Sequence, residues 1–250
     1  MPPTAVLSRL LLAALCSLAP VTLIAVSGLS VPAASAPATP EPGFVNLFNG
    51  RDLTGWKGDT RIWSVRDGAI VGESKPDTGL AENSYLIWQD GTLADFELRA
   101  QFKIESGNSG IYCRARIRPP GQTTPDPLIG WQADIDTKNW WTGVIMEWTG
   151  REKLAERGQR VHLRSDGTRE VVGSLGNSDA LATHIRPVGE WNDYTIRAVG
   201  GEISLTVNGV RMTELLDEDE RRVLTGLLAL QLHVGPPMRV QFKNLRLLIL

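Results

Sequence analysis

The sequence predicts an all-β protein in which two sheets pack as a sandwich or jelly roll. About a dozen short segments alternate apolar and polar residues, and turn residues such as glycine, asparagine and aspartate separate them. Few stretches show the spacing of an amphipathic helix. No internal repeat and no further linker follows residue 43. We therefore expect residues 44–250 to form one β-sandwich domain.

The N-terminal region is predicted to be a secretory signal followed by a linker. Arg9 precedes an apolar run from Leu10 to about Leu29, which Pro20 interrupts. Residues 1–36 then contain the signal peptide and cleavage region, and residues 37–43 form a flexible linker. An uncleaved membrane anchor is the alternative, but Pro20 and the following small residues argue against it. We expect a periplasmic or secreted protein with no stable membrane insertion after signal removal.

Each β-segment is predicted from its own alternation. Residues 61–72 form a hairpin that turns at Arg66-Asp67-Gly68, and residues 193–212 contain turns at Gly200-Gly201 and Asn208-Gly209. Further strands are predicted at 84–89, 95–104, 109–117, 129–136, 143–148, 160–165, 226–234 and 239–250. The stretch 213–224 fits a short helix or an acidic loop, and residues 148–187 show a weaker pattern.

Charge and cysteine content exclude some classes of protein. The formal net charge is -2 and no long basic run occurs, so we expect no nucleic-acid partner. After signal removal, Cys113 would be the remaining cysteine, so no intramolecular disulfide is expected. Cys113 falls on an apolar strand face, where it is expected to be a small buried side chain.

Four predicted central strands have one apolar face and one face with hydrogen-bonding side chains. The apolar faces are Ile111 and Cys113; Trp131, Ala133 and Ile135; Val144, Met146 and Trp148; and Leu228, Leu230, Leu232 and Val234. The opposite faces contain Tyr112 and Arg114; Gln132, Asp134 and Asp136; Ile145 and Glu147; and Gln231 and His233. An antiparallel sheet that faces water shows the same alternation, so a solvated surface is one interpretation.

The other interpretation is a sugar-binding groove. Planar hydrogen-bonding side chains suit sugar hydroxyls, and aromatic rings suit the sugar ring. The candidate substrate-binding residues are Arg114, Gln132, Gln231, Tyr112 and Trp141. Trp140 is expected nearby, and we expect the strands to bring the polar residues together on one concave face.

Several motifs make the chain resemble the 3-keto-disaccharide hydrolase domain family, from about Phe44 to Leu250. The motifs are FVNLFNGRDLTGW, WSVRDGAIVG, DFELRAQFKIESGNSGIYCR, GWQADID, PVGEWNDYTIRAVGGEISLTVNG and LQLHVGPPMRVQFKNLRL. The resemblance implies a concanavalin A-like jelly-roll sandwich in an exported protein. It also implies hydrolysis of glycosides whose sugar carries a ketone at C3. A sugar 3-dehydrogenase acting upstream would be the corresponding enzyme partner.

A ketone at C3 acidifies the C2 hydrogen, which allows elimination of the glycosidic oxygen from C1 and then addition of water. This route needs a base, a group that stabilises the enolate oxygen, and an acid. His233 fits the base by its intrinsic pKa, Arg114 the cation at the enolate oxygen, and Asp134 or Glu147 the remaining proton transfer. No cofactor is required. Alternatively, His233, Asp134 and Glu147 bind a divalent metal ion that polarises the substrate.

Two other functions match part of the same pattern. A retaining β-glucanase needs a strand with two suitably spaced carboxylates, but Gln132 stands where its nucleophilic glutamate would be. A non-catalytic, lectin-like carbohydrate-binding module would need the same groove without a titrating His233. The second function remains an alternative.

Overall fold

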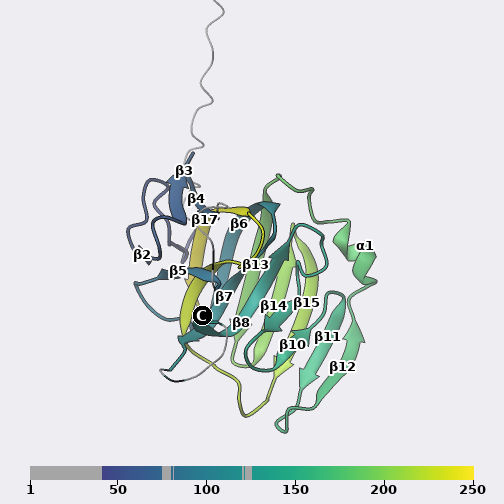
Figure 1. Cartoon of the computed structure of the whole chain (residues 1–250). Coiled ribbons are helices and arrows are strands. Elements are labelled where there is room, and N and C mark those ends of the chain that lie inside the picture. Colours follow the sequence, from purple (N-terminus) through teal and green to yellow (C-terminus); the bar gives the residue numbers. More distant parts are fainter. Residues whose placement is uncertain (1–40, 75–79, 81, 120, 122–125) are drawn as a thin grey trace, which may run out of the picture. The chain divides into compact units, whose positions relative to one another are not determined.

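The structure, a computed structural model, describes residues 41–74, 80, 82–119, 121 and 126–250, so the predicted signal peptide lies outside the described residues. Two β-sheets face each other across an apolar core, which confirms the predicted all-β sandwich (Figure 1). The helix α1 (Ser178–Ala182) lies between β12 and β13 in the chain. Within the described ranges, no helix is long and apolar enough to span a membrane.

The larger sheet has ten strands, and its order from β17 to β12 can be followed in Figure 1. In spatial order they are β12 (Arg169–Ser174), β11 (Gln159–Leu163), β15 (Val210–Asp217), β14 (Glu202–Val207), β13 (Asn192–Val199), β6 (Phe96–Ser106), β17 (Arg239–Ile249), β4 (Ala69–Glu73) and β3 (Trp63–Arg66), with β1 (Val45–Asn46) also paired to β17. Strands β11 and β15 pair in parallel, unlike the antiparallel pairs around them.

The smaller sheet has seven strands and carries the residues expected to form the site. Its order is β10 (Glu152–Ala155), β9 (Ile145–Glu147), β8 (Leu128–Asp136), β7 (Asn108–Ile117), β16 (Leu227–Leu232), β5 (Ser84–Trp88) and β2 (Trp56–Lys57). Strands β8, β7 and β16 therefore lie side by side at its centre, where both faces can be covered.

The inner face of the seven-stranded sheet has the predicted register on three strands. The core contains Ile111 and Cys113 of β7, Trp131, Ala133 and Ile135 of β8, and Leu228, Leu230 and Leu232 of β16, each at most 2% exposed. Because successive strand residues point to opposite faces, Tyr112, Gln132 and Gln231 lie on the outer face. Burial raises the pKa of the free Cys113 thiol, as expected for a small core side chain.

The prediction for β9 is wrong by one residue. Ile145 packs in the core, whereas Met146 pairs with Gln132 and therefore lies on the outer face. On β9 the core side chain is Ile145, whereas the apolar side chains of Met146 and Trp148 lie on the outer face. In the remaining weaker regions, 213–217 continues β15, and residues 148–187 contain β10, β11, β12 and α1.

Candidate functional site

Five side chains converge on the outer face of the seven-stranded sheet. On the central strand β7, Tyr112 lies opposite Gln132 of β8 in the backbone register. Gly110 of the same strand lies opposite Asp134 of β8 on one side and Gln231 of β16 on the other. Tyr112, Gln132, Asp134 and Gln231 are at most 1% exposed, and the Asn108 amide donates to Asp134 at 2.9 Å. We call Asn108, Tyr112, Gln132, Asp134 and Gln231 the polar floor.

The polar floor has hydrogen-bonding capacity that the described residues do not use. Within the described part of the chain, Oε1 of Gln132, Oδ1 of Asn108, and both Oε1 and Nε2 of Gln231 have no hydrogen-bond partner. Leaving such atoms unpaired in a protein interior costs free energy, so each indicates a partner that is not among these residues. Gly110 makes the arrangement sterically possible, because a Cβ there would lie 2.3 Å from Oε1 of Gln132.

Asp134 is the carboxyl group of the polar floor. Burial raises its pKa well above the usual value, and the nearby Asp136 raises it further. Hydrogen bonds to Oδ1 from the Asn108 amide and the Ile135 N–H, each 2.9 Å long, act in the opposite direction. Burial is the largest of these effects, so the pKa of Asp134 is raised overall.

The same outer face also has an apolar part, so it is less uniformly polar than predicted. Tyr85, Ala115, Leu128 and Ala229 form a second buried cluster together with Tyr112. The rings of Tyr85 and Tyr112 meet edge to face, with centroids 5.1 Å apart. This contact fixes the position of Tyr112 at the border between the two parts.

Two cavities meet at His233, directly after the end of β16. The first, of about 480 Å³, is lined by Ser106, Gly107, Asn108, Asp134, Asp136, Thr137, Lys138, Trp140, Trp141, Trp148, His233, Val234, Pro236, Pro237 and Met238. The second, of about 230 Å³, is lined by Glu82, Asn83, Asp126, Trp148, Thr149, His233 and Val234. His233 is partly buried, and its Nδ1 contacts the carbonyl oxygen of Val234. The structure therefore brings His233, Asp134 and Trp141 to one cavity.

Asp136 shapes the loop that carries two of the tryptophans. Its carboxylate accepts hydrogen bonds from the backbone N–H groups of Lys138, Trp140, Trp141 and Thr142, over 3.0–3.2 Å. The Thr142 hydroxyl donates to it as well, at 3.1 Å. A short aspartate side chain that accepts from several following amides fixes a compact turn. Asp136 thus positions Trp140 and Trp141 and has little capacity left for a ligand.

Arg114 does not lie in the predicted groove. Its φ of 50° marks a bulge in β7, where the pairing registers with β8 and β16 both shift. The guanidinium donates to the carbonyl oxygens of Ala94, at 2.6 and 2.8 Å, and Gly200, at 2.7 Å. Arg114 is 1% exposed and connects β7 to the bend before β6 and to the turn between β13 and β14, so its predicted place in the groove is wrong.

Glu147 is also directed away from the polar floor. Its carboxylate accepts from the Arg151 guanidinium at 2.7 Å, and Arg151 pairs with Asp217 of β15 at 2.8 Å. This buried ion-pair cluster connects β9 of the smaller sheet to β15 of the larger sheet. Among the described residues, no group of three or more histidine, cysteine, aspartate or glutamate side chains could hold a metal ion. The structure does not bring Glu147 together with His233 and Asp134, so this expected ligand set is not assembled.

Strand alternation could have identified Asn108, because it shares a face with Gly110 and Tyr112. It could not have identified Asn83 and Asp126, which lie outside the patterned strands. Asp126 accepts hydrogen bonds from the Asn83 amide at 2.5 Å and from the Tyr85 hydroxyl at 2.9 Å. Both residues line the second cavity, and only the folded structure brings them together there.

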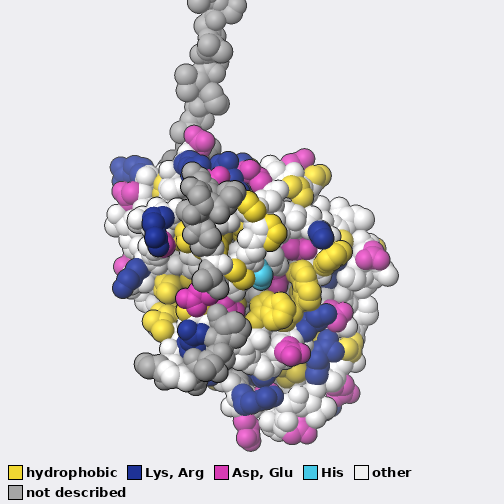
Figure 2. Space-filling view, viewed as in Figure 1, with side chains coloured by type: hydrophobic (Ala, Val, Ile, Leu, Met, Phe, Trp, Pro, Cys, Tyr) yellow, Lys and Arg dark blue, Asp and Glu magenta, His cyan; other side chains and the backbone are white. Residues whose placement is uncertain are grey.

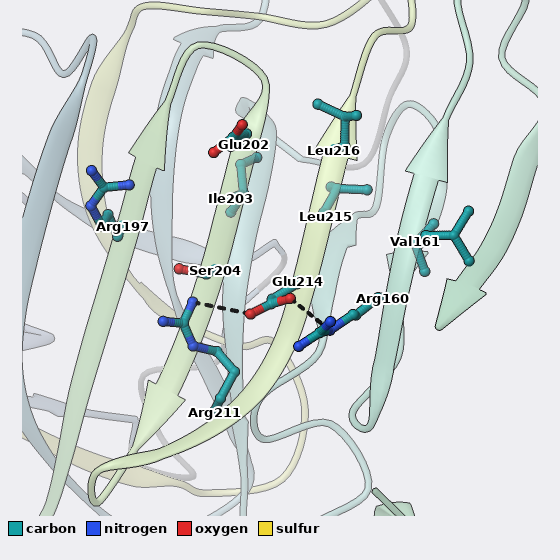
Figure 3. Close-up of a pocket in the computed structure, with 11 residues that line it drawn as sticks. Arg160, Val161, Arg197, Glu202, Ile203, Ser204, Arg211, Glu214, Leu215 and Leu216 are labelled. Carbon is teal, nitrogen blue, oxygen red and sulfur yellow. Dashed lines mark ion pairs between the residues drawn. The ribbon is translucent and has the colours of Figure 1, made fainter. Parts of the chain in front are cut away.

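A third cavity, of about 550 Å³, lies on the outward face of the ten-stranded sheet (Figure 3). Figure 3 shows Glu214 between Arg160 and Arg211, at distances of 2.9 and 3.7 Å. The two guanidinium groups share the one carboxylate, and all three side chains are substantially exposed. The cavity lacks the buried, unpartnered polar atoms of the polar floor, which makes it the weaker candidate for a functional site.

Figure 2 shows basic and acidic side chains interspersed over the visible face, without a continuous basic area. Hydrophobic side chains are exposed near the middle of the same face. Such mixed charge does not provide the phosphate-tracking surface of a nucleic-acid-binding protein on this side.

Comparisons with known proteins agree with the fold. Two crystal structures of candidate glycosyl hydrolases from Parabacteroides distasonis are similar over 83% of this chain. The first has 23% identity, a TM-score of 0.54 and 94% coverage of its own chain; the second has 18%, 0.53 and 99%. A comparison with curated protein sequences gave no significant match. The family model of the 3-keto-α-glucoside-1,2-lyase-like domain matches residues 43–248. The chain therefore belongs to the 3-keto-α-glucoside-1,2-lyase-like domain family.

Proposed function

We propose that this carbohydrate-active protein cleaves the glycosidic bond of 3-keto-glycosides, including 3-keto-disaccharides, by elimination followed by hydration. The observation that carries the proposal is that His233 and Asp134 line one cavity beside the polar floor. His233 supplies an imidazole nitrogen that can accept a proton, and Asp134 supplies a carboxyl group whose pKa is raised by burial. Membership in a family described as lyase-like supports elimination as the bond-breaking step.

In the proposed reaction, His233 removes the proton from C2 of the sugar. The electron pair of the C2–H bond forms a double bond between C1 and C2, and the C1–O bond breaks with its electrons on the leaving oxygen. Asp134 supplies a proton to that oxygen. Water then adds to the enone, with oxygen bonding to C1 and hydrogen to C2, which gives the free 3-keto sugar.

The remaining requirement is a donor for the enolate oxygen at C3, because Arg114 is committed elsewhere. Asn108 lines the cavity together with His233 and Asp134 and is suited to this role, because its amide has two N–H groups and one of them donates to Asp134. Gln132, Tyr112 and Gln231 are buried and line neither cavity, so their contacts with sugar hydroxyls stay predictions. A metal ion at the site is not required by these steps. An upstream sugar 3-dehydrogenase would supply the ketone, and secretion or periplasmic location would expose the protein to such sugars.

The experiment is to incubate the purified protein with 3-keto-trehalose, 3-keto-sucrose and a 3-keto-glucoside in D₂O and follow each by NMR. We expect cleavage of the keto sugars, deuterium at C2 of the product, and no cleavage of the unoxidised parents. Cleavage without deuterium at C2 contradicts elimination. Binding without cleavage contradicts the enzymatic proposal and supports a carbohydrate-binding module. Activity that a chelator removes and a divalent ion restores would add a metal to the site.

A further inference from the structure

The lining of the 480 Å³ cavity combines two kinds of side chain. Asn108, Asp134 and His233 are polar. We call the following aromatic and apolar side chains the tryptophan-lined end: Trp140, Trp141, Trp148, Pro236, Pro237 and Met238. Trp140 is 67% exposed and Trp148 48% exposed, and both line the same cavity, so their apolar surfaces are accessible to a ligand there.

Polar groups near the tryptophans already have partners. Asp136 accepts from four backbone N–H groups and the Thr142 hydroxyl. The Thr137 hydroxyl donates to the Gly107 carbonyl at 3.2 Å, and the Ser106 hydroxyl accepts from a backbone N–H at 3.1 Å. Tryptophan rings can also pack against a sugar ring, but a second sugar would find few free partners for its hydroxyl groups among Asp136, Thr137 and Ser106, and the Lys138 ammonium is the exception in this lining. An aromatic ring needs none.

The tryptophans are held as a preformed apolar wall. The Lys138 ammonium lies over the ring of Trp140, 4.5 Å from its centroid, and Lys153 lies over Trp141 at 5.0 Å. Trp141 also packs against Trp148, with centroids 6.4 Å apart and ring planes tilted by 46°. Rings fixed in this way lose little entropy when a flat ligand packs against them.

The second cavity supplies the complementary polar surroundings on the other side of His233. Glu82, Asn83, Asp126 and Thr149 line it, and it shares His233 and Trp148 with the first cavity. A sugar ring near His233 would therefore lie close to side chains of both cavities, and Trp148 belongs to both.

We propose that the tryptophan-lined end binds the leaving group of the substrate, and that this group is an aromatic ring rather than a second sugar. The inference rests on the proposed function, whose site it deepens. The substrate class would be 3-keto-glycosides of phenols. When the C1–O bond breaks, its electron pair passes to a phenolic oxygen, which needs less proton donation than the oxygen of a sugar alcohol.

Isothermal titration calorimetry with unoxidised ligands tests the binding part without turnover. Phenyl α-glucoside should bind roughly 10-fold more tightly than methyl α-glucoside, because one aromatic contact of this kind is worth about 1 kcal/mol or slightly more. Trehalose should bind no more tightly than methyl α-glucoside. Trp140→Ala and Trp148→Ala should each remove most of the phenyl advantage, whereas Trp140→Phe should retain it. Both positions are exposed enough for truncation without unfolding.

Trp191→Ala is the matched control, since Trp191 lies under Lys103 and Lys243 and outside both cavities. This variant should retain the full phenyl advantage. Three results would overturn the inference: phenyl α-glucoside does not bind, trehalose binds more tightly than methyl α-glucoside, or the phenyl advantage survives both tryptophan truncations. NMR of 3-keto phenyl glucoside separates the two proposals. Tryptophan-dependent phenyl binding without cleavage contradicts the proposed enzyme function and leaves the aryl-binding site in place.

Discussion

Replacing Arg114 with methionine tests whether this residue stabilises the sandwich or contacts the substrate. The substitution keeps an unbranched side chain but removes the guanidinium, which makes three hydrogen bonds of 2.6–2.8 Å to the Ala94 and Gly200 carbonyls and a longer one of 3.3 Å to the exposed Asp95 carboxylate. Hydrogen bonds to charged groups contribute about 1.5–3 kcal/mol each. Two of the three share one carbonyl, so we expect the free energy of unfolding to fall by about 3–5 kcal/mol.

Urea denaturation followed by tryptophan fluorescence measures this loss. With a slope of about 2–3 kcal/mol/M, the midpoint should fall by roughly 1–2 M. Cleavage of a 3-keto-glycoside at low temperature, expressed per folded molecule, should stay near the wild-type value. Arg116→Met is the matched control, because Arg116 is exposed on the same strand, and its midpoint should hardly change. Unchanged stability combined with lost activity would refute the structural role and return Arg114 to the substrate.

Three further substitutions examine the site itself. His233→Ala should lower the kcat for cleavage of a 3-keto-glycoside by roughly 10²–10⁴-fold, as expected for a positioned base. His162→Ala is the control, because His162 lies outside both cavities, and its kcat should not fall. Equal losses of kcat in the two variants contradict the assignment of His233. Because the folded-state pKa of Asp134 is raised, its stabilising contribution is present below the unfolded-state pKa and is lost as the pH rises through the folded-state pKa. Between about pH 4 and 8, the Tm of the wild type should therefore fall relative to the Tm of Asp134→Asn. Parallel Tm curves for the two proteins contradict this. Gly110→Ala should lower the free energy of unfolding by about 1–3 kcal/mol, because the new methyl group clashes with Gln132. In urea titrations, the double variant with Gln132→Ala should recover part of this loss. Strictly additive losses in the two single variants exclude the clash.

Alternation predicted the fold and the polar floor where the strands are regular. Tyr112, Gln132 and Gln231 lie on the predicted face because β7, β8 and β16 keep an uninterrupted two-residue period through them. The same rule failed at Arg114, where a single residue with positive φ changes the side to which the chain points. Sequence alone gives little warning of such a bulge, since arginine is not a residue that favours this backbone conformation.

The error at β9 has a different physical origin. Met146 and Trp148 are apolar, so the sequence indicated a core face, but Trp148 lines both cavities and Glu147 is held inside by Arg151. Apolar side chains that serve a binding site and charged side chains that are buried in pairs reverse the usual pattern. Contacts between distant loops, such as that of Asn83 with Asp126, leave no periodic signal at all.

The position of β17 has a consequence for how the chain reaches its folded state. This last strand of the structure lies between β6 and β4, both of which belong to the first half of the chain. During synthesis, the ten-stranded sheet cannot close until residues 239–249 have left the ribosome. Until then β4 and β6 each present an open edge to which other chains can pair. Late closure of this kind slows folding, because the most distant partners must meet last, and it lengthens the time during which a chaperone can hold the polypeptide unfolded.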